Sequence, residues 1–377
     1  MSFQRRPMAA RAFGCLARVS NALQAWPQRM TPAPFRLLQI GSAFWQSRVL
    51  NVAARLDLAT VLGDSDLSAA DLADKVDADS RALLRLLRML AAIGVFDEVT
   101  PGTYRNNKLS SALRTDRADN VRAMVLMHNA PEMSLPWLEP LEQGIRTGEV
   151  PFRLQHGQDL YDYMDSHPAF DALFAQAMDR VDALTGDSFA TEFDWQAFDR
   201  IIDVGGSKGA KSMAILKRHP HLQAVVVDRA QAVAGAADFW RERHGPDVAQ
   251  ALARMRFEVG DVLTVVPAAA SPRDAYLLSA VLHGFDDATC VQALRTVARA
   301  AAVQGAALVL LEMVMPDHHA DLTAASFDMQ MFMGTRGCER TRGEWEHVFA
   351  RSGVRLVEIV HLASFGKMLV LRPEQAA

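Results

Sequence analysis

Acidic residues are absent from the first 56 positions of this chain, whereas eight arginines lie there. That stretch therefore carries a formal charge of +8, and since the whole chain carries −4, the remainder carries −12. Such an acidic body would repel phosphates, which disfavours nucleic acid as the main partner.

Cysteine is scarce, and long apolar runs are missing. Cys15, Cys290 and Cys338 show no metal-binding or redox spacing, so we expect a reducing cytoplasm and no metal site. No stretch approaches the ~18 uninterrupted apolar residues of a membrane span, so we expect no membrane association. The arginine-rich start lacks the serine enrichment of a transit peptide. We therefore expect residues 1–34 to form a basic tail, disordered in part.

One stretch organises the second half of the chain. Ile201 and Ile202 belong to a buried strand, a turn rich in glycine spans 205–209, and a helix is expected over 210–218. A turn of this kind exposes backbone N–H groups at the start of a helix and lets a ligand approach the backbone closely. It favours a cofactor that carries an anionic or carboxylate group.

Strands and helices alternate after this turn. The apolar runs predict strands at 222–228, 256–261, 275–279 and 306–312, helices at 230–243, 286–301, 321–333 and 342–352, and a final hairpin at 354–371. This order predicts a doubly wound, mostly parallel sheet with a C-terminal antiparallel hairpin. Ligands of such sheets lie beyond the carboxyl ends of the strands. The residues expected at those ends are Gly205, Asp228, Asp261, Ser279, His283 and Glu312.

The first half is mainly helical. Apolar residues at helical spacing predict one helix over 35–62, a second over 67–76 capped by Ser68, and a third over 81–93. A small hairpin over 95–105 completes the pattern of a winged helix. We expect this otherwise all-helical domain over 35–115 and a helical connector over 116–195.

A winged helix can bind DNA or another protein. Arg81, Arg85 and Arg88 could face phosphates, but leucines cover much of the same helix and many acids flank it. We therefore favour a protein–protein role. A DNA-binding regulator with a metabolite-sensing domain stays open as an alternative.

Aromatic and methionine side chains on two predicted helices have two interpretations. Phe174 and Met178 lie on one helix and Met331 and Phe332 on the other. Core packing is the simpler interpretation, whereas the functional one is a flat apolar pocket for an aromatic ligand.

Three cofactors compete for the glycine turn. A nucleotide triphosphate loop requires glycine where Ala210 stands, and a dinucleotide loop requires it at both Ser207 and Ala210. S-adenosylmethionine carries no phosphate and tolerates a less open turn. Its ribose would suit the carboxylate of Asp228, and its adenine amine would suit that of Asp261.

Several motifs occur in a fixed order along the chain: 203-DVGGSKG-209, 260-GD-261, 282-LHGFDD-287, 311-LEMVMP-316 and 337-GCERTRGEW-345. Together they resemble the S-adenosylmethionine-dependent O-methyltransferases of the plant caffeate and bacterial polyketide or phenazine type. The resemblance covers roughly residues 35–372. It implies a Rossmann-like methyltransferase domain over 196–377 and a homodimer formed through the winged helix.

The resemblance also implies individual roles. His283 would be the catalytic base, with Glu312 and Glu339 flanking and orienting it. For the chemistry itself, we expect Glu312 to fix the tautomer of its ring. The implied cofactor contacts are Gly205, Asp228, Asp261, Val262 and Ser279.

Two departures from the family pattern affect these roles. Ser207 replaces the middle glycine of the turn, and Gly284-Phe285 follows His283 where Asp-Trp is usual. We expect transfer of a methyl group to a phenolic hydroxyl of an aromatic small molecule. A ring nitrogen as the acceptor stays an open alternative.

Overall fold

The computed structural model describes residues 2–184, 186–243 and 245–374. The chain divides into two compact units. One comprises Met1–Asn21 together with Thr185–Ala377, and the other comprises Ala22–Leu184. The proposed boundary between the domain at 35–115 and the connector at 116–195 falls inside the second unit and stays a prediction.

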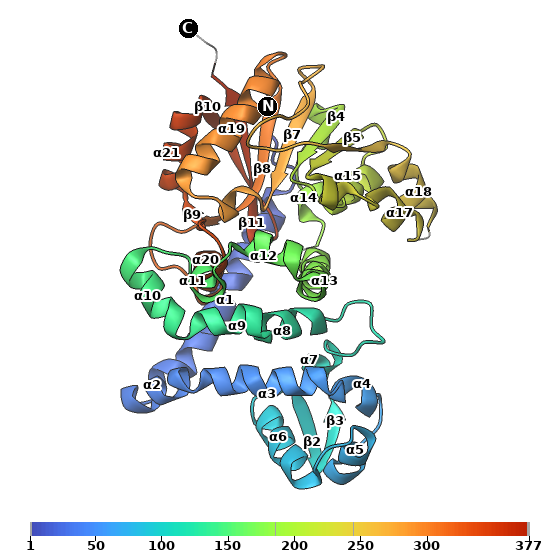
Figure 1. The fold of residues 1–377 in the computed structure, drawn as a ribbon, viewed down its shortest axis with the longest axis vertical. Helices are drawn as coiled ribbons and strands as arrows, with labels where there is room; N and C mark the ends of the chain where they lie inside the picture. The colour runs from blue at the N-terminus through green and yellow to red at the C-terminus, as the bar shows by residue number, and fades with distance from the viewer. Residues whose placement is uncertain (1, 185, 244, 375–377) are drawn as a thin grey trace. The chain divides into compact units, whose positions relative to one another are not determined.

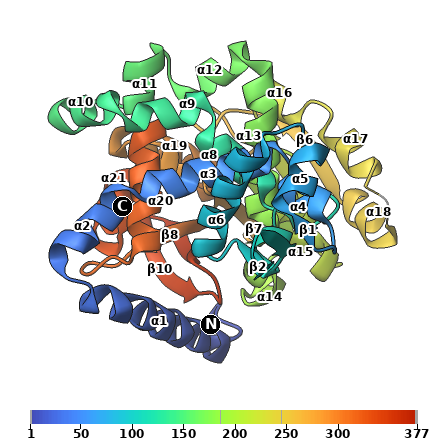
Figure 2. The same ribbon diagram turned by 90° about the horizontal axis from the view of Figure 1, so that it is seen from below.

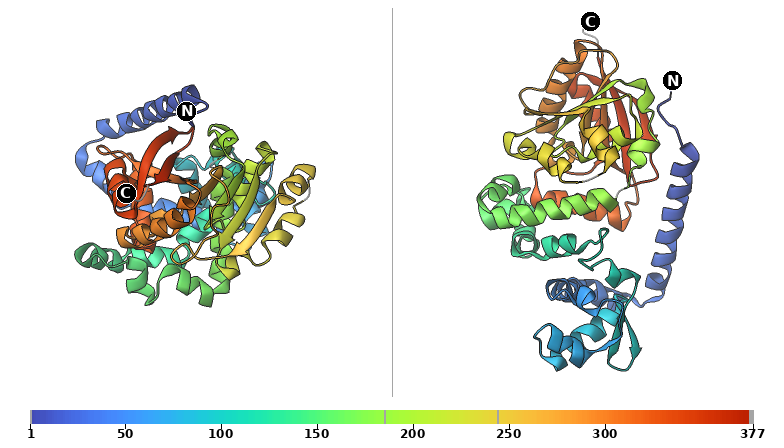
Figure 3. Two further views of the ribbon diagram at one scale, coloured as in Figure 1. Left: turned by 90° about the horizontal axis from the view of Figure 1, so that it is seen from above. Right: turned by 90° about the vertical axis from the view of Figure 1, so that its right-hand side faces the viewer.

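The C-terminal unit contains a large sheet (Figure 1). Its strands are β4 (Arg200–Val204), β5 (Gln223–Asp228), β6 (Met255–Val259), β7 (Asp274–Ser279), β8 (Ala307–Met315), β9 (Arg340–Thr341), β10 (Val354–His361) and β11 (Gly366–Pro373). The order is β10-β11-β8-β7-β4-β5-β6, with β9 beside β8. Among the described strand pairs of this sheet, the two that β11 forms with β10 and β8 are antiparallel, and the others are parallel. The hairpin, red in Figure 3, lies at the end of the sheet opposite β6. The predicted doubly wound sheet is confirmed.

Helices cover both faces of this sheet. They are α14 (Ser188–Thr191), η2 (Trp195–Ala197), α15 (Ala210–Arg218), α16 (Ala230–Val233), α17 (Ala236–Arg241), α18 (Pro246–Leu252), η3 (Leu282–Gly284), α19 (Asp287–Ala302), α20 (Leu322–Gly334) and α21 (Arg342–Ser352). Side chains of α19 and α21 form one core with the sheet. Side chains of α14, α15 and α18 form the core on the other face.

One predicted helix of this unit is wrong. The helix expected over 230–243 is divided between α16 and α17, because Gly235 adopts a left-handed conformation with φ 69° between them. Pro246 then starts α18, which the sequence analysis did not predict.

The N-terminal segment is a helix where a partly disordered tail was expected. Helix α1 spans Pro7–Met30, and Pro7 occupies its first position, where proline costs nothing. Before it, the side-chain amide of Gln4 donates to the carbonyl of His361 and accepts from its N–H, both at 2.9 Å. Phe13 meets Phe365 edge-on, and Figure 2 shows the start of α1 beside the C-terminal hairpin.

The other unit begins with the predicted winged helix. Its first elements are α2 (Ala33–Gly41), α3 (Ala43–Arg55), α4 (Leu58–Leu62), β1 (Leu67–Ser68), α5 (Ala69–Lys75), α6 (Ser80–Ala92), β2 (Phe96–Thr100) and β3 (Thr103–Asn106). Ser68 caps α5 and Asp79 caps α6, as their side chains predict. The expected hairpin is confirmed, and β1 adds a third strand beside β3, so the domain is mainly but not entirely helical.

The single helix expected over 35–62 is wrong. The structure has three helices there, and Asp57 separates the last two with a left-handed φ of 51°. No residue of α2 is buried, although it carries several large apolar side chains. Hydrophobic periodicity alone does not show such breaks.

Helices make up the rest of this unit. They are α7 (Lys108–Ser111), α8 (Arg122–Asn129), α9 (Pro131–Ser134), η1 (Leu135–Trp137), α10 (Glu139–Thr147), α11 (Pro151–His156), α12 (Leu160–Ser166) and α13 (Pro168–Leu184). Helix α13 carries two of the residues predicted for the acceptor pocket.

Candidate active site

The predicted cofactor residues gather at one edge of the sheet. Gly205 follows β4, Asp228 ends β5, Asp261 and Val262 follow β6, and Ser279 ends β7. Because these strands are parallel neighbours, their carboxyl ends meet at the same edge. The backbone therefore brings together residues that are up to 74 positions apart.

The glycine turn has a backbone that few side chains permit. Gly205 and Gly209 both have φ 75°, and Ser207 has φ 50° in place of the usual glycine. A β-carbon on Gly205 would lie 2.7 Å from Cγ2 of Val281. The glycine thus lets the turn after β4 pack against the segment that leads to His283.

A buried carboxyl lies beneath the same turn. Asp203 is 1% exposed and accepts a hydrogen bond of 2.7 Å from the hydroxyl of Ser212. Burial raises its pKa to about 6, although the bond from Ser212 opposes the shift. A β-carbon on Gly206 would lie 2.7 Å from one carboxyl oxygen of Asp203, so glycine is required there as well.

The two carboxylates predicted to bind the cofactor are held by backbone N–H groups. Oδ2 of Asp228 accepts from the N–H of Ser207 at 2.8 Å, and Oδ1 accepts from the N–H of Arg229 at 2.7 Å. Oδ1 of Asp261 accepts from the N–H of Leu263 at 2.8 Å. Each carboxylate oxygen has two lone pairs, so both residues keep acceptor capacity for a ribose hydroxyl or an adenine amine. These residues therefore fit the predicted cofactor, S-adenosylmethionine.

His283 lies on η3, just beyond the end of β7. Its Nδ1 is 2.8 Å from Oε1 of Glu339, and its side chain is 23% exposed. Among the residues that the structure describes, Nε2 forms no hydrogen bond. With the proton on Nδ1 donated to the carboxylate, Nε2 is left as a free base.

Glu312 does not have the role that the sequence suggested. Its Oε1 accepts from the backbone N–H groups of Val281 and Leu282, at 3.1 and 3.0 Å, so it holds the backbone before His283. The partner of the ring is Glu339, and the expectation that Glu312 fixes the tautomer is wrong. Within the described chain, Oε2 of Glu312 and Oε2 of Glu339 are buried without a partner.

Burial and charge shift the acid–base equilibria of this group. Desolvation raises the pKa of Glu312 to about 7, and the charge of His283 opposes that shift. Desolvation alone would lower the pKa of His283, but its bond to Glu339 and the charges of Glu312 and Glu339 raise it above the usual 6.5. The imidazole is therefore a stronger base than one in water.

Of the four predicted acceptor residues, two lie in each compact unit. Met331 and Phe332 lie on α20 and are half-buried. Phe174 and Met178 lie on α13, are also half-buried, and Phe174 lies 6.2 Å, between ring centroids, from Phe170. None of the four side chains is fully buried in a hydrophobic core.

Two residues that contact the segment around His283 were given no role by the sequence analysis. A β-carbon on Gly337 would lie 1.8 Å from the carbonyl oxygen of His283, and Arg340 is a buried arginine, 1% exposed. Both belong to the motif at 337–345, which was the only available signal. Glu344, in the same motif, forms a capping box with Thr341 at the start of α21.

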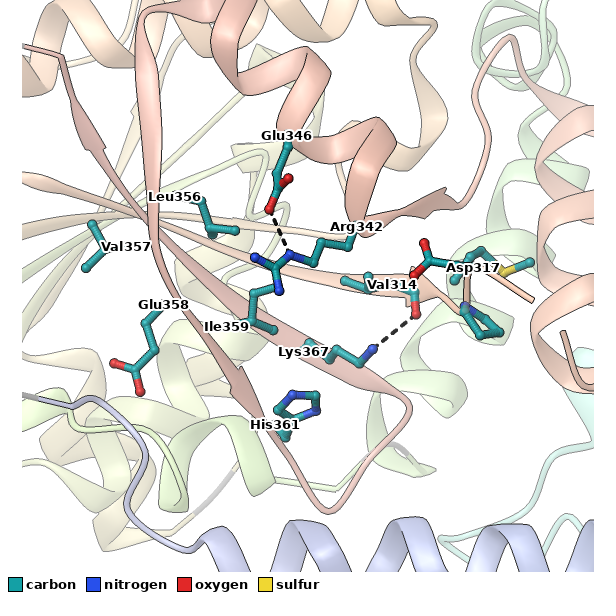
Figure 4. A pocket seen from close by; sticks show the side chains of 12 residues that line it. Val314, Asp317, Arg342, Glu346, Leu356, Val357, Glu358, Ile359, His361 and Lys367 are labelled. Atoms are coloured by element: carbon teal, nitrogen blue, oxygen red, sulfur yellow. Dashed lines mark hydrogen bonds and ion pairs between the residues drawn. The ribbon is translucent and has the colours of Figure 1, made fainter. Parts of the chain in front are cut away.

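A separate hollow of about 500 Å³ opens between α21, the end of β8 and the C-terminal hairpin (Figure 4). Arg342 pairs there with Glu346, and Lys367 donates to the carbonyl of Val314, as the dashed lines show. None of the predicted site residues lines it.

The sequence matches two family profiles. An O-methyltransferase domain matches residues 138–355, and an O-methyltransferase dimerisation domain matches residues 38–116.

The chain belongs to the O-methyltransferase family.

Individual relatives support this assignment. A phenazine O-methyltransferase of Lysobacter antibioticus, PhzM, is 29% identical over 89% of this chain and 95% of its own. A phenazine-1-carboxylate N-methyltransferase of Pseudomonas aeruginosa is also 29% identical, over 89% and 96%.

A solved structure shows the same fold with ligands bound. The O-methyltransferase NcsB1 of neocarzinostatin biosynthesis, in complex with S-adenosylmethionine and 2-hydroxy-5-methyl naphthoic acid, superposes with a TM-score of 0.72. It is 27% identical over 87% of this chain and 96% of its own. Family membership and such complexes indicate S-adenosylmethionine as the cofactor of this O-methyltransferase.

Within the described residues, no helix is both long and apolar enough to cross a membrane.

Proposed function

We propose that this O-methyltransferase transfers the methyl group of S-adenosylmethionine to a phenolic hydroxyl of an aromatic small molecule. His283 acts as the general base, and Glu339 orients it. The observation that carries the proposal is the bond of 2.8 Å between Nδ1 of His283 and Glu339, on a ring that is still 23% exposed.

The cofactor would lie across the carboxyl edge of the sheet. The backbone of Gly205 lines its methionyl end, Asp228 accepts from its ribose, and Asp261 accepts from its adenine amine. Val262 and Ser279 complete the contacts. When bound, this group supplies an electrophilic methyl carbon on a sulfonium.

The chain itself contributes alignment and a proton acceptor. A phenol has a pKa of about 10, so at neutral pH most of it keeps its proton. Nε2 of His283 would accept that proton, which makes the phenolic oxygen nucleophilic, and the bound cofactor would supply the methyl group and leave as the thioether S-adenosylhomocysteine. Glu339 holds the ring through Nδ1 and stabilises the imidazolium that forms, as a buried carboxylate does in other histidine–carboxylate pairs.

Met331 and Phe332 on α20 would contact the acceptor ring, and the assignment of Phe174 and Met178 on α13 to the acceptor stays a prediction. Aromatic faces and thioether sulfur are favourable contacts for a flat apolar molecule. These side chains are half-buried, so part of their surface is available to a ligand.

A nitrogen acceptor is the second candidate. It is favoured by the relative that is named as an N-methyltransferase and that covers as much of this chain as the O-methyltransferase relative does. A neutral heterocyclic nitrogen needs no base before it attacks, so His283 would then contribute little to turnover.

We also propose a homodimer. The matched dimerisation domain includes the second half of α2, which buries none of its residues in a single chain. Light scattering at micromolar concentration is expected to give twice the mass of 41.4 kDa, and a monomer would contradict this assignment.

The decisive experiment on the chemistry is His283→Ala. We expect turnover with phenolic acceptors to fall by ~10²–10⁴, while calorimetry shows unchanged affinity for S-adenosylmethionine. The matched control is His318→Ala, which removes an exposed imidazole outside the site. Unchanged turnover of His283→Ala would refute the base assignment, and unchanged turnover confined to nitrogen acceptors would favour the second candidate.

A further inference from the structure

Arg340 is buried in the C-terminal unit, and burial of a lone charge is costly. It is 1% exposed and lies on β9, which pairs with the end of β8. A buried cation persists only where hydrogen bonds and a counter-charge compensate for its lost hydration.

The guanidinium group finds these partners on both sides of His283. Nη2 donates to the carbonyl of Phe285 at 2.8 Å, and Nη1 donates to the carbonyl of Leu282 at 3.3 Å. Nε donates to the carboxylate of Asp287 at 3.0 Å. In the sequence, one of these carbonyls precedes His283 and the other follows Gly284. One planar group therefore holds the backbone on both sides of the base.

The neighbours of Arg340 in the sequence hold the same histidine by other means. Glu339 bonds to its ring, and the backbone of Gly337 packs against its carbonyl so closely that a β-carbon would lie 1.8 Å away. Segment 337–340 therefore holds the ring, the peptide and the flanking carbonyls at once. Its attachment to β8 transfers this arrangement to the sheet.

We propose that Arg340 is a positioning residue for His283: it fixes the backbone of η3 so that the imidazole meets both Glu339 and the acceptor. This inference rests on the proposed function of His283 as the base. Arg340 does not touch the acceptor or the cofactor in this role. It acts through the conformation of residues 282–285.

The chemistry of arginine is required here. Its planar fork reaches two separate carbonyls, and its centre lies 5.1 Å from the ring centroid of Trp345, over its face. Lysine keeps the charge but not the fixed fork, so it can hold one carbonyl at most in the same plane. Methionine keeps the approximate length and loses every hydrogen bond.

The chain offers a matched control at the other edge of the sheet. Arg254 precedes β6 and donates to the carbonyls of Leu222 at 2.7 Å and Leu216 at 2.7 Å. It is a carbonyl-holding arginine of the same kind, at the amino ends of the strands. Arg254→Met is expected to lower stability without changing turnover.

The first test compares Arg340→Lys, Arg340→Met and Arg254→Met in the full chain. We expect kcat to fall more than tenfold in Arg340→Met and less in Arg340→Lys, while calorimetry gives an affinity for S-adenosylmethionine within about threefold of the parent protein. Calorimetry also reports the folded fraction, and if Arg340→Met does not fold, Arg340→Lys decides. Unchanged kcat in the folded Arg340 variants, or an equal fall in Arg254→Met, would overturn the proposal.

The second test combines Arg340→Lys with His283→Ala. If Arg340 acts through His283, its replacement has no further effect on kcat once the imidazole is gone. Additive losses would overturn the positioning role and leave the base assignment intact. Full activity of His283→Ala alone would instead refute the proposed function, so the two failures are distinguishable.

Discussion

The two halves of the carboxyl edge use carboxylates in opposite ways. On the cofactor side, Asp228 is half-buried and Asp261 is exposed, and both accept from nearby backbone N–H groups. On the base side, Glu312 is 2% and Glu339 is 6% exposed, and each keeps one oxygen without a partner among the described residues.

This difference separates binding from chemistry. Asp228 and Asp261 are partly or fully exposed, so a ligand can reach their carboxylates. Glu312 and Glu339 are buried instead, and their charges raise the pKa of His283. The four variants below test whether the two halves can be disturbed independently.

The largest effect is expected at Gly337. Gly337→Ala places a β-carbon against the carbonyl of His283, where no flexible side chain can move aside. We expect a loss of about 3 kcal/mol in the free energy of unfolding, measured by urea denaturation, together with lower turnover. Gly343→Ala is the control, since its β-carbon would meet nothing within 4 Å. Equal stability of the two variants would show that the base side is not tightly packed.

Glu339→Gln is expected to act on chemistry alone. Loss of a charged hydrogen bond worth about 1.5–3 kcal/mol lowers kcat roughly 10- to 100-fold. The hydrogen bond to Glu339 and its charge raise the pKa of His283. The charge of Glu312 also raises this pKa, and the charge of Arg340 lowers it. Removing the charge of Glu339 therefore lowers that pKa.

The same variant makes a prediction about pH. The base must be neutral, so turnover rises with pH as His283 loses its proton. The acid limb of the kcat profile should therefore move to lower pH in Glu339→Gln. A limb that stays in place or moves to higher pH would contradict the assigned pair.

Asp228→Asn is expected to act on binding alone. Asparagine keeps one acceptor oxygen and loses the charge, so the Kd for S-adenosylmethionine should rise about tenfold, which corresponds to about 1.4 kcal/mol. Calorimetry measures it, and Asp238→Asn, which alters an exposed ion pair, is the control. An unchanged Kd would remove Asp228 from the cofactor site.

The smallest effect is expected at Ser207. Its φ of 50° is unfavourable for a residue with a β-carbon, so Ser207→Gly relieves that strain while it frees the unfolded chain. The two terms nearly cancel, and we expect a gain of at most about 1 kcal/mol in unfolding free energy. A clear loss of stability would show that the hydroxyl of Ser207 has a structural role.

Much of the fold was predictable because its signals are local. The strands at 222–228 and 275–279 were predicted to within one residue, and Ser68 caps the helix that it was expected to start. The breaks at Asp57 and Gly235 were missed, since a left-handed residue inside an apolar pattern leaves no periodic trace.

The site was predictable only where strand ends coincide with polar residues. Asp228 and Ser279 are such positions, and the sheet brings them to one edge. That Glu312 holds the backbone while Glu339 alone bonds to the ring was not predictable, because it depends on which carboxylate reaches which partner. Arg340 was also missed, because an arginine in a sequence of mixed charge gives no sign that it is buried.

Val281 filling the space above Gly205 has a consequence for engineering. Since the glycine turn at 205–209 and the segment that leads to His283 pack against each other there, we expect them to move as one body. Libraries aimed at new acceptors can therefore hold both turns constant and vary Met331 and Phe332 on α20, with little risk to methyl-group alignment.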